Sequence, residues 1–143
     1  MTYSRDGLHL TEQFEGCRRE AYQDSRGIWT CGYGHTRGVG PGTVVTQAQA
    51  EEWLAEDVAE AEHAVNALVK VPLTQGQFDA LVDFTFNLGA GTLERSTLLR
   101  LLNEKRYDYV ADQFLAWDHA AGREVDGLKR RREAEREMFI RSA

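Results

Sequence analysis

Apolar residues recur three and four positions apart over residues 46–70, which is the spacing of one face of an α-helix. Thr46 can cap the start of this helix, and Gln49 three residues later completes a capping box. Pro72 lies just beyond the end, where the helix cannot continue. The pattern therefore predicts one connecting helix of about 35 Å, at about 1.5 Å per residue. Its apolar face is made of Trp53, Leu54, Val58, Ala61, Val65 and Leu68.

Shorter helices are expected in the second half of the chain. Thr74 and Gln77 form a second capping box ahead of an apolar run that Gly89 ends. Ser96 can cap the helix that follows it. Two more helices are expected, over residues 107–117 and 128–140.

Residues 17–45 interrupt the helical pattern. A helix over residues 4–15 comes before them and should end at Gly16. Glycines then separate short runs such as "IWTCGYGHT", which is typical of a small sheet with tight turns. The pattern predicts an α+β fold that is mainly helical, with a small sheet near the N-terminus.

The net charge of −6 comes mostly from one segment. Residues 46–70 carry six acids and one lysine, whereas the rest of the chain is nearly balanced. The basic run "KRRR" at 129–132 is followed at once by Glu133, Glu135 and Glu137. A nucleic acid is therefore not expected as a partner.

No apolar run approaches the roughly 18 residues of a membrane-spanning helix. The N-terminus "MTYSRDGLHLTEQFEG" also lacks the apolar core of a signal peptide. We therefore expect a protein made in the cytoplasm, without stable membrane association.

Two cysteines, Cys17 and Cys31, are too few for a disulfide framework. We expect both to be reduced packing residues. A bridge between them is the alternative, and it requires a geometry that sequence does not supply.

Two acids in residues 14–36 are candidates for catalysis. Hydrolysis of a glycosidic bond commonly needs a protonated acid for the leaving oxygen and a second, ionised carboxylate. Glu15 ends the first helix beside Phe14, and both features disfavour its charged form. Asp24 lies in the polar stretch "YQDSRG", where donors could keep it ionised, and the Thr30 hydroxyl could hold a water. Spacing alone leaves the alternative open, in which Glu15 pairs with a surface arginine and Asp24 is a turn residue.

The stretch "FEGCRREAYQDSRGIWTCGYGHT" resembles the signature of the phage-type lysozymes, the endolysin muramidases of glycoside hydrolase family 24. Their pattern has Glu-Gly, then Ala-Tyr-x-Asp, then Trp-Thr-x-Gly-Tyr-Gly-His. The similarity continues, in the expected order, through "TQAQAEEWLAEDV", "FNLGAGTLERSTLLRLLN", "ADQFLAW" and "GLKRRREAE".

The resemblance implies a role for each candidate. Glu15 would be the general acid, Asp24 the second carboxylate and Thr30 the residue that positions the water. The reaction would be cleavage of the β-1,4 bond between N-acetylmuramic acid and N-acetylglucosamine, with inversion and without a metal or other cofactor. The resemblance also places four residues at the rim of a substrate cleft, although ordinary packing or solvation is the alternative for each: Thr36, Phe86, Asn87 and Gln113.

The resemblance further implies a lysozyme-like fold with two lobes in a single catalytic domain, residues 1–143. The N-terminal lobe, about 12–60, would hold an antiparallel sheet, and the helical C-terminal lobe, about 71–143, would pack with the first helix. An ion pair is expected between His35 and Asp57. Arg130 and Arg131 could neutralise acids near the first helix, or simply belong to a solvated helix face.

The expected substrate is bacterial peptidoglycan, and the expected biological outcome is lysis of the bacterial cell wall. We expect a monomer made in the host cytoplasm that reaches the wall once a membrane-perforating partner has permeabilised the membrane. The alternative in another class is a lysozyme-fold module that binds the wall, or a partner, without cleaving it.

Overall fold

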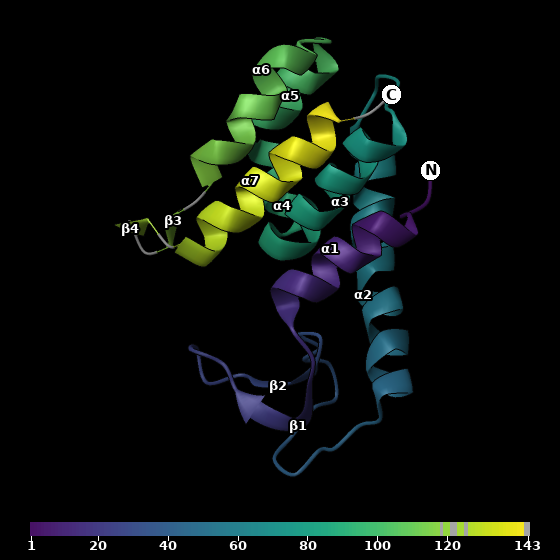
Figure 1. The fold of residues 1–143 in the computed structure, drawn as a ribbon, viewed down its shortest axis with the longest axis vertical. Coiled ribbons are helices and arrows are strands. Elements are labelled where there is room, and N and C mark those ends of the chain that lie inside the picture. Colours follow the sequence, from purple (N-terminus) through teal and green to yellow (C-terminus); the bar gives the residue numbers. More distant parts are fainter. Residues whose placement is uncertain (118, 121–122, 125, 142–143) are drawn as a thin grey trace. The chain divides into compact units, whose positions relative to one another are not determined.

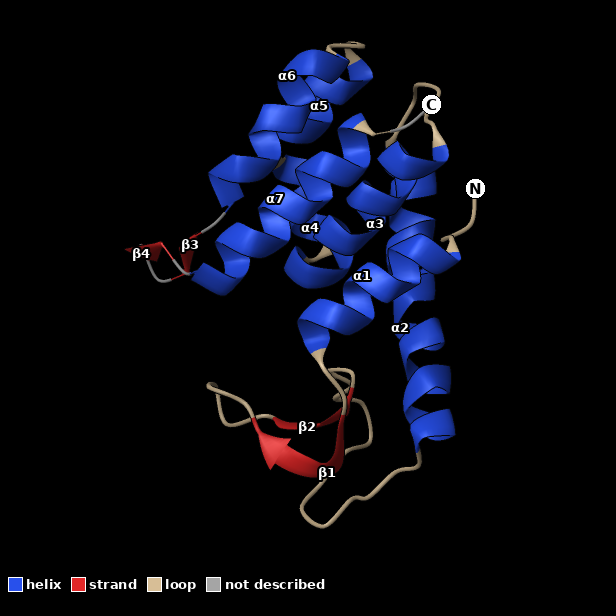
Figure 2. Ribbon diagram, in the orientation of Figure 1, coloured by secondary structure: helices blue, strands red, loops and turns tan. Residues whose placement is uncertain are grey.

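The computed structural model describes residues 1–117, 119–120, 123–124 and 126–141. Helices dominate it, and its strands form two short hairpins (Figures 1 and 2), so the predicted α+β, mainly helical fold is confirmed. In chain order the elements are α1 (Arg5–Glu15), β1 (Arg18–Gln23), β2 (Trp29–Gly32), α2 (Gln47–Leu68), α3 (Gln75–Leu88), α4 (Ala90–Arg95), α5 (Thr97–Asn103), α6 (Tyr107–Gln113), the 3-10 helix η1 (Phe114–Trp117), β3 (His119–Ala120), β4 (Arg123–Glu124) and α7 (Asp126–Ile140).

The chain forms two compact units, each of which is described by itself. The sheet unit comprises Thr11–Ala59, and the helical unit comprises Met1–Leu10 with Glu60–Ala143. Helices α1 and α2 both begin in one unit and end in the other.

The sheet unit is built on the antiparallel pair β1 and β2. Tyr22 pairs with Thr30 and Gln23 with Trp29, and an irregularity in β1 lies between these pairs and the next. A further bridge joins Glu20 of β1 to Val44. The small antiparallel sheet expected between the first helix and the long helix is therefore confirmed.

A tight turn after β2 carries the predicted ion pair. Cys31 and His35 exchange two backbone hydrogen bonds of 2.9 and 3.0 Å, which close the turn. Nδ1 of the buried His35 lies 2.8 Å from Oδ2 of Asp57, and its ring stacks on Trp53 with centroids 4.2 Å apart. The pairing of His35 with Asp57 is confirmed, and it fastens the turn to α2.

The helices end where the local sequence signals predict at several positions. Gly16 has a φ of 66°, which favours glycine, and its N–H closes α1 by donating to Glu12 at 2.9 Å. Thr46 caps α2 by accepting from the Gln49 N–H at 3.1 Å. Both halves of the capping box at the start of α3 form, Gly89 caps its end, and Ser96 caps α5.

The core of the helical unit is aromatic. Helices α3 and α7 pack side by side (Figure 1), and the buried rings of Phe84 and Phe114 meet edge to face at 5.6 Å. The ring of Phe139 on α7 is tilted against that of Phe114, with centroids 5.6 Å apart. Burial of each such ring away from water contributes about 1.5–3 kcal/mol to the free energy of folding.

Charged side chains are also buried between α3 and α7. Arg131 donates two hydrogen bonds of 2.9 Å to the carboxylate of Asp83 on α3. On the same helix, Arg132 and Glu135 form a second fully buried pair, with Nη2 donating to Oε2 at 2.8 Å. Arg131 therefore neutralises an acid of α3, and the alternative of a solvated face is wrong for Arg131. Arg130 is exposed, in agreement with that alternative.

Short elements departed from the prediction. Helix α4 was not expected, and residues 107–117 divide into α6 and a 3-10 turn instead of one helix. The last helix begins at Asp126, two residues earlier than expected, and the two-residue strands β3 and β4 were not foreseen. Both cysteines are free, as expected for packing residues. Among the described residues, we find no helix with the length and apolar character needed to cross a membrane.

Candidate active site

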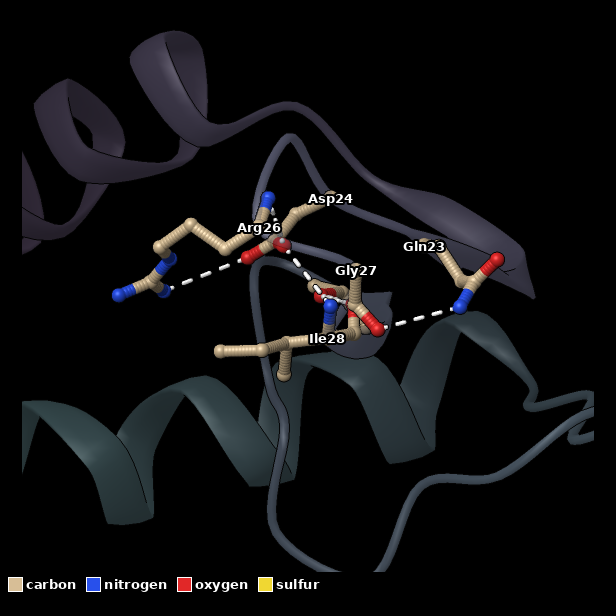
Figure 3. A network of polar contacts seen from close by, with 6 residues as sticks. Gln23, Asp24, Arg26, Gly27 and Ile28 are labelled. Carbon is tan, nitrogen blue, oxygen red and sulfur yellow. Dashed lines mark hydrogen bonds and ion pairs between the residues drawn. The ribbon is translucent and has the colours of Figure 1, made fainter.

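Asp24 lies in the turn that connects β1 to β2 (Figure 3). The turn is closed by two backbone hydrogen bonds of 2.9 Å, from Asp24 N–H to the Ile28 carbonyl and from Gly27 N–H to the Asp24 carbonyl. The Gln23 side chain adds a third bond by donating to the Gly27 carbonyl at 3.1 Å. The backbone that carries the carboxylate is therefore held at both ends of the turn.

Donors surround the Asp24 carboxylate. Oδ1 accepts from the backbone N–H groups of Arg26 at 2.8 Å and Ile28 at 3.0 Å, and the Arg26 guanidinium lies 3.3 Å from Oδ2. The Ile28 N–H is the largest cause of a lowered pKa for Asp24. Desolvation is the next largest effect and opposes it, and the Arg26 N–H and guanidinium lower the pKa further. The local donors predicted around Asp24 are confirmed, and they favour its ionised form. Asp24 also lies in a turn, so the alternative in which it is a turn residue is consistent with the same hydrogen bonds.

Thr30 faces the same side of the hairpin as Asp24. Thr30 pairs with Tyr22 on β1, and Asp24 follows β1 opposite Ile28. Thr30 and Asp24 are therefore diagonal neighbours, a relation that corresponds to roughly 7–8 Å between residues in a regular antiparallel ladder. The buried Thr30 hydroxyl donates to the Ile28 carbonyl at 3.0 Å. Because a hydroxyl has one hydrogen and two lone pairs, this oxygen can still accept a hydrogen bond from water.

Glu15 is the last residue of α1 and is half-buried. Its carboxyl lies against the backbone of Gly34, in the turn after β2. A Cβ atom built on Gly34 would lie 2.7 Å from Oε1 of Glu15. The sheet unit thus brings Glu15, Asp24 and Thr30 into one compact body, and the protonation of Glu15 stays a prediction.

The four residues expected to contact substrate are divided between the units. Thr36 is exposed in the sheet unit. Phe86 and Asn87 are half-buried in the last turn of α3, and Gln113 is half-buried at the end of α6. Asn87 Oδ1 is buried without a hydrogen-bond partner among the residues that the structure describes. The substrate-binding roles of all four stay predictions.

Sequence reasoning missed two features of the site. Arg26 was not considered as a partner of Asp24, although it lies two residues away. Gly34 was treated only as a turn residue, although the glycines on both sides of Tyr33 are a signal of close backbone approach. Within the part of the chain that the structure describes, no three His, Cys, Asp or Glu residues gather in a way that could hold a metal ion.

Comparison with known proteins gives a consistent family. The family described as phage lysozyme has a sequence model that matches residues 12–135. An endolysin of Acyrthosiphon pisum secondary endosymbiont phage 1 is 43% identical, over 97% of this chain and 98% of its own length. The endolysin of Salmonella phage P22 is also 43% identical, over 98% of this chain and 99% of its own.

Solved structures agree with these relatives. The muramidase domain of SpmX from Asticaccaulis excentricus superposes with a TM-score of 0.92 at 40% identity, covering 97% of each chain. A mutant of P22 lysozyme gives a TM-score of 0.87 at 43% identity, covering 98% of this chain and 99% of its own. These similarities extend over nearly the whole sequence, and the chain belongs to the phage lysozyme family.

Proposed function

We propose that this protein is a lysozyme that hydrolyses bacterial peptidoglycan at the β-1,4 bond between N-acetylmuramic acid and N-acetylglucosamine. The observation that carries the proposal is the setting of Asp24, whose ionised form backbone donors favour, with Thr30 on the same side of the hairpin. Glu15 supplies a second carboxyl in the same unit. Two carboxyl groups in different settings are what glycosidic hydrolysis requires.

Glu15 acts as the general acid in this proposal. Its protonated carboxyl donates a proton to the glycosidic oxygen as the bond from that oxygen to the anomeric carbon breaks. Positive charge develops on the sugar ring in the transition state, and the Asp24 carboxylate stabilises it. The leaving N-acetylglucosamine keeps the transferred proton as its free 4-hydroxyl group.

Thr30 and Asp24 position the attacking water. Since the Thr30 hydroxyl donates to the Ile28 carbonyl, its lone pairs accept a hydrogen bond from one O–H of the water, and that O–H is kept in the product. The Asp24 carboxylate accepts the other proton as the water oxygen bonds to the anomeric carbon. Attack from the face opposite the leaving group inverts the configuration, and the first product is then the α-anomer. Nuclear magnetic resonance during the first turnovers tests this, because a β-anomer formed first requires retention.

Site variants test the catalytic assignment. We expect Glu15→Gln to keep the fold and lose nearly all wall-lytic activity, because an amide has no proton to donate and positioned acid catalysis is worth about 10²–10⁴-fold. Glu12→Gln and Glu20→Gln are matched controls, because these acids lie in the same unit without an assigned role. The measurement is the clearing of permeabilised bacterial cells, with folding checked by circular dichroism.

Two outcomes would contradict the proposal. If Glu15→Gln stays within about tenfold of the parent while a control variant is inactive, the acid lies elsewhere. If the folded parent clears no cells at any pH or salt concentration, the chain is a module that binds without cleaving.

Substrate contacts at Thr36, Phe86, Asn87 and Gln113 form part of the proposal. An alanine at a contact position should raise KM for wall fragments more than it lowers kcat, since such contacts bind ground state and transition state alike. Unchanged KM in all four variants would assign these residues to packing or solvation.

We also propose that the protein acts as a monomer and reaches the wall through a membrane opened by a perforating partner. Light scattering should then give the 16.2 kDa of one chain. Added to bacteria from outside, it should lyse permeabilised cells, and expressed inside a host it should lyse cells only when the membrane is perforated. Lysis on expression alone would remove the need for a partner.

A further inference from the structure

The guanidinium of Arg26 lies against Oδ2 of Asp24, the second carboxylate of the proposed active site (Figure 3). We propose that Arg26 is a specificity-determining residue that leaves Asp24 to bind a carboxylate of the substrate, so that anionic wall fragments are hydrolysed in preference to neutral ones. This inference rests on the proposed function, because it concerns the substrate of the same site.

The two oxygens of Asp24 are held differently. Oδ1 accepts two backbone N–H bonds, from Arg26 at 2.8 Å and from Ile28 at 3.0 Å. Oδ2 accepts one bond, from the Arg26 guanidinium at 3.3 Å. Because a carboxylate oxygen offers two lone-pair sites, the turn uses both sites of Oδ1. Oδ2 is therefore the oxygen that accepts the proton of the attacking water, and the guanidinium lies beside it.

A positive charge at Oδ2 opposes both roles proposed for Asp24. Besides the larger effect of the Ile28 N–H, the Arg26 guanidinium lowers the pKa of Asp24, which makes the carboxylate a weaker base. The guanidinium also offsets part of the negative charge that stabilises the sugar cation in the transition state. Catalysis should therefore improve when the guanidinium moves away from Oδ2.

The Arg26 side chain is able to move away. It is 74% exposed, its bond to Oδ2 is long, and it makes no other hydrogen bond or ion pair with a residue that the structure describes. An exposed ion pair of this kind favours the paired state by no more than about 5-fold. The backbone N–H of Arg26 stays bonded to Oδ1 when the side chain leaves, so the turn does not depend on the ion pair.

A carboxylate is the group that best fits the released guanidinium. Two parallel N–H donors of an arginine match the two oxygens of a carboxylate, and such charge-assisted bonds are roughly twice as strong as neutral ones. The sugar rings of the wall polymer are uncharged. Its carboxylates lie on the peptides, or on the lactyl group of N-acetylmuramic acid where the peptide has been removed. Binding either carboxylate holds Arg26 away from Asp24 and couples recognition of the substrate to catalysis.

The test compares wall fragments that have the same glycan and differ in charge. Soluble peptide-bearing fragments are used as isolated, after an amidase has removed the peptides to leave lactyl carboxylates, and after coupling to methylamine has neutralised every carboxylate. For each form, kcat/KM is measured with the parent, Arg26→Ala and Arg26→Lys. Arg37→Ala is the matched control, because Arg37 is 71% exposed and pairs with Asp57 at 3.6 Å in the same unit, while Asp57 has no assigned role in catalysis.

We expect Arg26→Ala to change the two charge states in opposite directions. For an anionic form, kcat/KM should fall at least about 5-fold, because a hydrogen bond between charged groups is lost. For the neutral form, kcat/KM should rise by up to about 5-fold, because no guanidinium lies at Oδ2. Arg26→Lys keeps the charge and should fall between the parent and Arg26→Ala, and Arg37→Ala should keep the parent's ratio within about 2-fold. The anionic form that responds, peptide-bearing or peptide-free, identifies the source of the carboxylate.

Equal changes for anionic and neutral fragments, or no change for either, would overturn the inference. If Arg26→Ala does not fold, Arg26→Gln takes its place. Independently of activity, Glu15→Gln should bind anionic fragments more tightly than neutral ones, and adding Arg26→Ala should remove that difference. Equal affinities in Glu15→Gln alone would also overturn the inference, whereas an inactive parent or an active Glu15→Gln overturns the proposed function.

Discussion

The buried ion pair between α3 and α7 should make the helical unit lose much of its folding stability when one partner is replaced. Asp83 is fully buried and Arg131 is 5% exposed, and two hydrogen bonds of 2.9 Å join them. Replacing Asp83 with Asn removes the countercharge and leaves the guanidinium buried. Removal of one partner of a buried pair costs about 3–5 kcal/mol, so Asp83→Asn should lose stability by that amount.

Urea and thermal denaturation measure this loss directly. At about 2–4 °C per kcal/mol for a chain of this size, Tm should fall by roughly 6–20 °C. Asp112→Asn is the matched control. Asp112 of α6 pairs at 3.0 Å with Arg136, which lies on α7 like Arg131, but the Asp112 side chain is 71% exposed. Solvent screens that pair, and its loss should cost no more than about 1 kcal/mol. If both variants lose the same stability, burial does not strengthen the inner pair and the reasoning fails.

Three further predictions concern single residues. Burial raises the pKa of Glu135, so the folded carboxyl keeps its proton to higher pH than the unfolded one, and its contribution to stability falls as pH rises from about 4.3. Glu135→Gln should therefore gain stability relative to the parent as pH rises above about 4.3, and a constant difference in urea midpoints would refute this. Asp24→Asn should lower kcat at least about 100-fold with the fold intact, since the amide oxygen still accepts the turn N–H groups but carries no charge; retained activity would remove Asp24 from the mechanism. Thr30→Ala should slow turnover at unchanged KM, and a rise in KM alone would mean that the hydroxyl contacts substrate instead of water.

The Asp24 pKa sets a further limit on pH dependence. The backbone N–H of Ile28 lowers it, so the bonds that the carboxylate makes are present above the unfolded value of about 3.9. They are lost only as pH falls through the lower folded value. If activity falls as pH rises above about 4, the titration of another group should therefore be the cause. The midpoint of that fall should be the same in the parent and in Asp24→Asn.

Helix ends were predictable because their signals are local. The Thr74 and Gln77 capping box, the Ser96 cap and the Gly16 stop each involve groups within four residues, and all formed as expected. Helix α4, with six residues, is too short to show an apolar period, so its existence depends on tertiary packing.

Contacts across long separations were not predictable from residue patterns. Asp83 and Arg131 lie 48 positions apart, and only the packing of α3 on α7 brings them together. The donors of Asp24 are near in sequence, and their presence was anticipated, but which N–H groups point at the carboxylate depends on the turn geometry. The approach of Glu15 to Gly34 depends on the fold of the whole sheet unit.

Analysis of the products tests the central claim most directly. Purified peptidoglycan is digested with the parent and with Glu15→Gln, the new reducing ends are reduced with borohydride, and the released sugars are identified by mass spectrometry. The account predicts reduced N-acetylmuramic acid from the parent and none above background from Glu15→Gln. Reduced N-acetylglucosamine from the parent, or equal release by both proteins, would contradict it.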